Sequence, residues 1–130
     1  MKEIPTITFT WEKSMRNIFS PENLHLSIKK QVENYHTDTV KEVANAIIKN
    51  RVVVVGMKYN DSVFTARRAL KKANIAYTYL EYGGYFSQWR KRLALKMWTG
   101  WPTFPMIFMD GILVGGSKDL RLILKENSKL

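Results

Sequence analysis

In this chain of 130 residues, the side chains that could do chemistry are 21 lysines and arginines, two histidines and the short polar runs beside Phe104-Pro105 and Gly115-Gly116. The sequence contains no cysteine. Disulfide bonds, thiolate metal sites, iron–sulfur ligation and cysteine nucleophiles are therefore excluded. His25 and His36 lie far apart in the sequence, and we interpret them as surface residues rather than metal ligands. The remaining chemistry is charge and hydrogen bonding.

The charge is unevenly distributed. Residues 1–50 carry 7 Lys or Arg against 6 Asp or Glu, whereas residues 51–130 carry 14 against 5. A positive field of this kind attracts anions, which include small peptides, nucleic acids, acidic proteins and anionic lipids. Solubility alone is the alternative interpretation.

The elements that position these residues follow from hydrophobic periodicity and turn signals. Four consecutive valines indicate a buried strand of the kind found in parallel sheets. Asp110-Gly111 is a strong hairpin signal. In chain order we expect a helix over 37–50, a strand over 51–56, a helix over 61–73, a strand over 75–82, a helix over 85–98, strands over 106–109 and 112–114, and a helix over 117–125.

Three helices allow more specific predictions. For the helix over 37–50, Thr39 and Glu42 have the spacing of a capping box. For the helix over 85–98, we expect Trp89, Leu93 and Met97 to face inward. For the helix over 61–73, Asn60 and Asp61 are candidate N-caps.

The segment Thr103-Phe104-Pro105 before the hairpin and the segment Val114-Gly115-Gly116-Ser117-Lys118-Asp119-Leu120 after it resemble those of glutaredoxins. The resemblance implies an α/β fold of the thioredoxin/glutaredoxin type, with a central mixed four-stranded sheet flanked by helices. It assigns residues 37–130 to a glutaredoxin-like domain and leaves residues 1–36 as a partly helical N-terminal extension.

The resemblance also shows what is missing. Alignment places Asn60 at the position of the nucleophilic cysteine and Val63 at that of the second cysteine, so the active-site segment reads Asn60-Asp61-Ser62-Val63. Thiol–disulfide exchange requires a thiolate that attacks a disulfide sulfur. Ser62 does not replace it, because a hydroxyl stays protonated near neutral pH without an activating base. The family activity is glutathione-dependent thiol–disulfide oxidoreduction in redox homeostasis, and here we expect a degenerate site without catalysis, metal or iron–sulfur cluster.

The family's glutathione-binding positions are retained more fully. In the family, the backbone before a cis-proline bonds to the cysteinyl part of glutathione, and the Gly-Gly-x-x-Asp segment holds the γ-glutamyl end at a helix N-terminus. The residues that match these positions are Lys58, Phe104, Pro105, Gly116, Ser117, Lys118 and Asp119. Lys58 is displaced by one residue from the family lysine, and the usual Gln or Arg before Thr103 is absent. Arg92 and Lys96 are candidate substitutes for it.

These observations favour a protein that has lost the catalytic thiols and binds glutathione, a glutathione-like compound or a peptide without exchange. The alternative is a protein-interaction module whose basic surface docks an acidic partner. Nucleic-acid binding is a weaker alternative, because no known nucleic-acid-binding motif is present. No apolar run approaches the ~20 residues that span a bilayer, and the N-terminus lacks a signal-peptide pattern. We therefore expect a cytoplasmic protein.

Overall fold

The computed structural model describes residues 16–127. Its contacts divide the chain into a first unit that ends at Glu33 and a second unit that begins at Asn34. The described part of the first unit contains a short 3₁₀ helix, η1 (Pro21–Asn23), and one α-helix, α1 (Leu26–Glu33).

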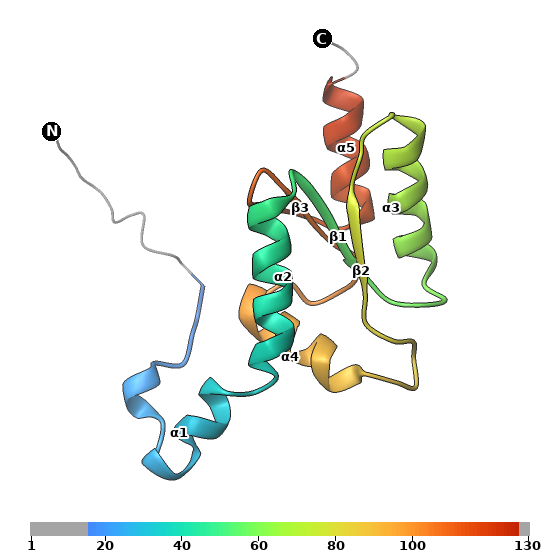
Figure 1. The fold of residues 1–130 in the computed structure, drawn as a ribbon. Helices are drawn as coiled ribbons and strands as arrows, with labels where there is room; N and C mark the ends of the chain where they lie inside the picture. Colours follow the sequence, from blue (N-terminus) through green and yellow to red (C-terminus); the bar gives the residue numbers. More distant parts are fainter. Residues whose placement is uncertain (1–15, 128–130) are drawn as a thin grey trace, which may run out of the picture. The chain divides into compact units, whose positions relative to one another are not determined.

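The second unit alternates helices and strands around one sheet (Figure 1). In chain order its elements are α2 (Thr37–Lys49), β1 (Val52–Gly56), α3 (Asp61–Lys72), β2 (Thr78–Glu81), α4 (Trp89–Thr99), β3 (Met106–Met109), β4 (Ile112–Gly115) and α5 (Ser117–Asn127). The strands form a four-stranded sheet in the order β2-β1-β3-β4. β1 pairs in parallel with β2 and antiparallel with β3, and β3 pairs antiparallel with β4. The predicted mixed sheet is confirmed.

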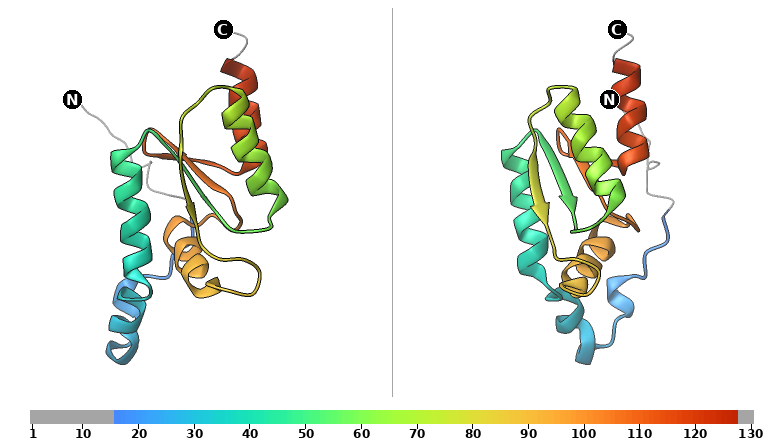
Figure 2. Two further views of the ribbon diagram at one scale, coloured as in Figure 1. Left: turned by 45° about the vertical axis from the view of Figure 1, so that its right-hand side comes forward. Right: turned by 90° about the vertical axis from the view of Figure 1, so that its right-hand side faces the viewer.

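Helices cover both faces of the sheet (Figure 2): α2 packs with α4 on one face, and α3 packs with α5 on the other. This arrangement explains the valine run, because every residue of β1 is buried. Val53 and Val55 belong to a core cluster with Val43 of α2, whereas Val52 and Val54 belong to a second cluster with Leu70, Leu120 and others from α3 and α5. A strand covered on both faces has no polar side.

The hairpin between β3 and β4 turns at Asp110-Gly111, as the sequence predicts. Both residues have positive φ, 52° and 81°. Such values are characteristic of the type I′ turn, whose twist matches that of the flanking strands. After the hairpin, β4 leads directly into α5. The N-terminus of α5 forms one wall of the site described below.

The prediction for α4 was wrong in two respects. The helix begins at Trp89 rather than at residue 85. Its buried residues are Arg92, Ala94 and Leu95, whereas Trp89, Leu93 and Met97 are 50%, 37% and 53% exposed. Arg92 faces inward because its guanidinium donates from Nη1 to the carbonyl oxygens of Tyr82 (2.7 Å) and Ser87 (2.6 Å). The apolar stripe of α4 therefore faces solvent.

The predicted capping box of α2 is also wrong. The helix begins at Thr37 after His36, whose φ is 44°, and no side chain caps it. Glu42 instead accepts a hydrogen bond at Oε1 from the hydroxyl of Tyr82. Burial of the phenol and this hydrogen bond raise the pKa of Tyr82. The bond ties α2 to the segment that follows β2.

Candidate functional site

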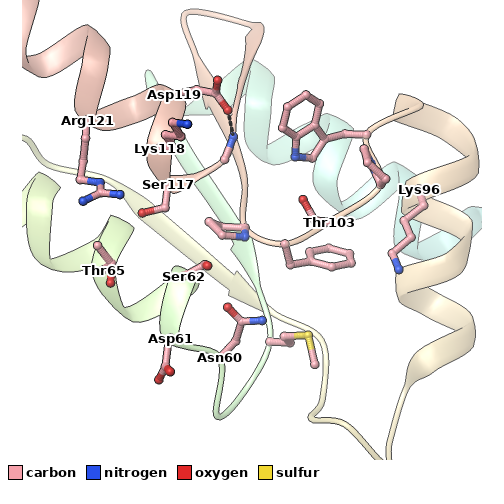
Figure 3. A pocket seen from close by; sticks show the side chains of 16 residues that line it. Asn60, Asp61, Ser62, Thr65, Lys96, Thr103, Ser117, Lys118, Asp119 and Arg121 are labelled. Atoms are coloured by element: carbon pink, nitrogen blue, oxygen red, sulfur yellow. Dashed lines mark hydrogen bonds between the residues drawn. The ribbon is translucent and has the colours of Figure 1, made fainter.

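A pocket of about 670 Å³ lies where three chain segments meet at one end of the sheet (Figure 3). The segments are the start of α3, the loop from α4 to β3 and the start of α5. The lining residues are Met57, Asn60, Asp61, Ser62, Thr65, Lys96, Trp101, Pro102, Thr103, Phe104, Pro105, Gly116, Ser117, Lys118, Asp119 and Arg121. The pocket thus brings together the segments that sequence reasoning assigned to binding.

At the first wall, Asn60 is the N-cap of α3. Its Oδ1 accepts a hydrogen bond from the backbone N–H of Val63 at 2.9 Å. This bond satisfies one of the N–H groups that a helix start leaves without an intrahelical partner. Val63 is buried and does not line this pocket, whereas Asp61 and Ser62 line it and are exposed. At this position the wall therefore offers an amide that is already bonded to its own helix.

At the second wall, the Phe104–Pro105 peptide bond is cis, as the family resemblance implies. Phe104 and Pro105 are buried, so the chain presents mainly backbone and ring edges there. The Lys96 Nζ lies 5.8 Å from the centre of the Phe104 ring. A cation at this distance is within range of a favourable interaction with the ring.

The third wall is the N-terminus of α5. The backbone N–H of Gly116 donates to Asp119 Oδ2 at 2.9 Å, so the Asp119 carboxylate caps its own helix. This geometry requires glycine at position 115, where φ is +116° and a Cβ would lie 2.5 Å from Asp119 Oδ2. A Cβ on Gly116 would meet nothing closer than 3.6 Å.

Two buried polar atoms beside the pocket, Trp101 Nε1 and Ser117 Oγ, have no hydrogen-bond partner among the described residues. Both belong to residues that line the cavity. Buried polar groups are nearly always satisfied by protein, water or ligand. A polar group of a ligand or a water molecule in the pocket could therefore form hydrogen bonds with these two atoms.

Cations outnumber carboxylates around the pocket. Lys96, Lys118 and Arg121 line it, against the carboxylates of Asp61 and Asp119. One of these carboxylates already accepts the Gly116 N–H. The start of α5 adds the partial positive charge of a helix N-terminus. The pocket is therefore suited to an anion.

Not every predicted residue reaches the pocket. Lys58 lines a neighbouring cavity of about 460 Å³, which shares Met57, Asn60 and Asp61 with the first. Arg92 was a candidate for carboxylate binding, but it is buried and bonded to backbone carbonyls, so that prediction was wrong.

Lys96, the second candidate substitute, does line the pocket. Sequence reasoning missed Arg121 and Thr65. Arg121 follows Ser117 by four residues, and this spacing places two side chains on one face of a helix. Thr65 follows Asp61 by the same interval on α3. The helical spacing was the signal that could have found both residues.

The neighbouring cavity has its own polar cluster. The Arg67 guanidinium lies 3.7 Å from the centre of the Tyr79 ring, and its Nε donates to the Tyr77 hydroxyl at 3.2 Å. The Tyr79 hydroxyl donates to Glu81 Oε1 at 2.9 Å. Burial, followed by this hydrogen bond to the carboxylate, raises the pKa of Tyr79 to about 12. These cationic and phenolic groups satisfy one another, so the cluster serves packing.

The basic residues that a nucleic-acid interface would use do not form one surface. Arg67, Arg68, Lys71 and Lys72 lie on α3, whereas Arg90, Lys91 and Arg92 lie on α4, and these helices cover opposite faces of the sheet (Figure 2). Arg67 stacks on Tyr79, and Arg92 is buried.

Comparison with solved structures identifies the fold, and comparison with known sequences then identifies the family. Oxidized glutaredoxin 2 from Chlamydomonas reinhardtii superposes with a TM-score of 0.61 at 24% identity, over 71% of this chain and 87% of that one. A buckwheat glutaredoxin–glutathione complex gives 0.65 at 19% identity, over 73% of this chain and 86% of that one. These similarities establish the thioredoxin/glutaredoxin fold.

The sequence comparisons are more specific. A "Glutaredoxin-like protein" of Dictyostelium discoideum is 46% identical over 102 residues, which are 78% of this chain and 83% of that protein. Mitochondrial glutaredoxin-2 of Pongo abelii is 30% identical over 104 residues, but the chain spans only 62% of its length. No family model matches the sequence. The chain belongs to the glutaredoxin-like family.

The donor set does not fit a cysteine-ligated iron–sulfur cluster, because the sequence has no thiol to supply. Within residues 16–127, no group of three or more His, Asp or Glu side chains is placed to hold a metal ion. No helix in the same range is long and apolar enough to cross a membrane.

Proposed function

We propose that this glutaredoxin-like protein binds glutathione, or a glutathione-like acidic peptide, without covalent exchange in the pocket between α3, the Phe104–Pro105 segment and α5. The observation that carries the proposal is the excess of cations around a cavity of about 670 Å³ that ends at a helix N-terminus. A small peptide with two carboxylates has the complementary charge.

Each wall would have its own role. The first N–H groups of α5 have no partner within the helix and would receive one carboxylate, with Lys118 and Arg121 beside them. The backbone at Phe104 would bond to the central residue of the peptide. Lys96, whose Nζ lies 5.8 Å from the centre of the Phe104 ring, would pair with the second carboxylate. The Asp119 carboxylate is less available to an ammonium group of the ligand, because it already accepts the Gly116 N–H.

No electron transfer accompanies this binding. Thiol–disulfide exchange would require a protein thiolate to attack the ligand sulfur, and the residue at that position is Asn60. Its amide is not a nucleophile, and its Oδ1 is engaged with α3. The ligand is therefore released chemically unchanged. A few charge-assisted hydrogen bonds of ~1.5–3 kcal/mol each must offset the loss of freedom on association, so we expect an affinity of about −4 to −6 kcal/mol, millimolar to high micromolar.

Calorimetric and NMR titration with glutathione, glutathione disulfide and S-methylglutathione tests the proposal. Glutathione and S-methylglutathione should bind within about twofold of each other, since the ligand thiol has no protein thiol to meet. Lys118→Gln and Arg121→Gln should each weaken binding by about three- to tenfold. Lys72→Gln at the far end of α3 is the matched control and should leave it unchanged.

Three results would contradict the proposal. The first is no chemical-shift change at the pocket with millimolar ligand. The second is an equal loss of affinity in the Lys72→Gln control. The third is turnover above a protein-free blank in a glutathione-coupled disulfide reduction assay, which would show that a group other than a thiol supports exchange.

A further inference from the structure

The second unit exposes a set of large apolar side chains that the proposed function does not use. We call this set the apolar edge, and it comprises Tyr59, Tyr85, Phe86, Trp89, Leu93 and Met97. Phe86 is 100% exposed and Tyr59 86%. Large apolar side chains that gather on one surface mark an interaction site, whereas single exposed ones do not.

The segments that carry the apolar edge adjoin one another. The loops after β1 and β2 lie at the same end of the sheet (Figure 1), and the Lys58 N–H donates to the Gly83 carbonyl at 2.7 Å. A Cβ on Gly84 would lie 3.7 Å from the Tyr59 ring. The second loop leads directly into α4, where Trp89, Leu93 and Met97 recur every four residues along the exposed face.

Cations predominate in the segments that carry the apolar edge. Lys58, Arg90 and Lys91 belong to the same segments, and residues 82–109 contain no Asp or Glu at all. The Arg90 guanidinium lies 4.4 Å from the centre of the Trp89 ring, so cationic and aromatic groups are interleaved. Asp61 and Glu81 adjoin these segments in the sequence, and Glu81 accepts the Tyr79 hydroxyl. Glu42 and Asp38 of α2 lie near Tyr82, at the start of the second loop, and Glu42 accepts the Tyr82 hydroxyl.

We propose that the apolar edge binds the headgroup region of an anionic lipid surface. Aromatic side chains favour the interface between hydrocarbon and water, and cations beside them attract anionic headgroups. A second copy of the chain would bring like charges together at this surface. Phe86 and Tyr59 project freely into solvent, and a fluid lipid interface accommodates projecting rings without a complementary groove.

Sedimentation with lipid vesicles tests the proposal on the full chain. Vesicles of roughly one third phosphatidylglycerol in phosphatidylcholine should bind the protein, and pure phosphatidylcholine vesicles should bind it at least about tenfold more weakly. Raising the salt from about 50 mM to about 500 mM should weaken binding to the anionic vesicles.

Two pairs of double variants locate the surface. Phe86→Ser with Trp89→Ser should reduce binding at least about tenfold, since each ring loses its burial in the interface. Phe19→Ser with Leu26→Ser removes two similarly exposed apolar side chains from the first unit and should leave binding unchanged.

For charge, Arg90→Gln with Lys91→Gln should weaken binding more than Arg68→Gln with Lys72→Gln on α3. Circular dichroism and thermal unfolding establish that each variant is folded.

Absence of binding to anionic vesicles overturns the proposal, as does equal weakening by Arg68→Gln with Lys72→Gln, which would indicate attraction by net charge alone. Polyglutamate is the competing probe. If it binds at low micromolar concentration and protects the apolar edge while vesicles do not, the surface docks an acidic protein instead. Glutathione titration of the Phe86→Ser, Trp89→Ser variant keeps the two proposals separate, because pocket binding should persist there.

Discussion

Replacing Asn60 with cysteine introduces a thiol at the position that the resemblance assigns to the family's nucleophile. The Asn60 Oδ1 accepts the Val63 N–H at 2.9 Å, and a thiolate on the same residue would face the same donor. A hydrogen bond to a charged group contributes ~1.5–3 kcal/mol, and the helix N-terminus contributes ~0.3–1 kcal/mol. One pKa unit corresponds to 1.36 kcal/mol, and partial exposure of the site reduces both contributions. The pKa of the new thiol should therefore fall from about 8.5 to about 6–7.

Ser62→Cys is the matched control. Ser62 lies two residues further on and is exposed, without the hydrogen bond that Asn60 makes. A thiol there is influenced mainly by the helix N-terminus, so its pKa should stay near 8. Alkylation rates of both variants with iodoacetamide, measured from about pH 5 to pH 9, give the two pKa values directly. Glutathionylation by glutathione disulfide at about pH 7 should be faster for Asn60→Cys, because more of its thiol is ionised.

Stability provides a second readout. Loss of the Asn60 cap should cost about 0.5–2 kcal/mol while the new thiol is neutral. A thiol with a depressed pKa in the folded state stabilises above its unfolded pKa of about 8.5, and this contribution is lost as pH falls through the folded value. Relative to the native chain, the variant should therefore gain stability between about pH 6 and pH 8.5. A pKa near 8.5, or equal alkylation rates in the two variants, would refute both the alignment and the inherited site.

Gly115→Ala should lower the free energy of unfolding by about 1–3 kcal/mol, because φ is +116° and the new methyl would meet the carboxylate that caps α5, whereas Gly116→Ala should change it by less than about 0.5 kcal/mol. Equal effects in urea unfolding would contradict the cap. Arg92→Gln should cost about 2–4 kcal/mol, because two loop carbonyls lose a charged donor, and the exposed Arg90→Gln should cost almost nothing. Because the pKa of Tyr82 is raised in the folded state, its phenol contributes stability that is complete below about pH 10 and is lost as pH rises above that value. Urea unfolding midpoints measured from about pH 8 to pH 11 should therefore fall less for Tyr82→Phe than for the native chain.

The features that were predictable from the sequence are governed by local physics. The valine run of β1 requires cover on both faces wherever it lies, and the Asp110-Gly111 turn fixes a hairpin through its own backbone angles. Asn60 caps α3 through a bond to a residue three positions away. Each of these outcomes depends on residues close together in the chain.

The features that were not predictable depend on distant partners. Periodicity assigned Trp89, Leu93 and Met97 to the interior, yet Arg92 occupies it because the carbonyls of Tyr82 and the following loop require a donor. A helical pattern indicates that one stripe is apolar without showing which stripe meets the sheet.

Glu42 is a second case of the same kind. Its spacing from Thr39 suggested a cap, and its partner is the Tyr82 hydroxyl, 40 residues away. In the site itself, the segments named from the resemblance line one pocket, whereas Arg121 enters only because α5 turns it toward that pocket.

Persistence of the site's geometry does not by itself require a ligand. Asn60 caps α3, and Asp119 caps α5 and makes Gly115 necessary, so selection for folding alone would keep all three. Lys118 and Arg121 are different, because both are exposed, both line the pocket, and neither has a folding role of this kind. A binding function therefore depends on these cations more than on the motif residues. If Lys118→Gln and Arg121→Gln left the affinity for glutathione unchanged, the proposed binding function would be refuted.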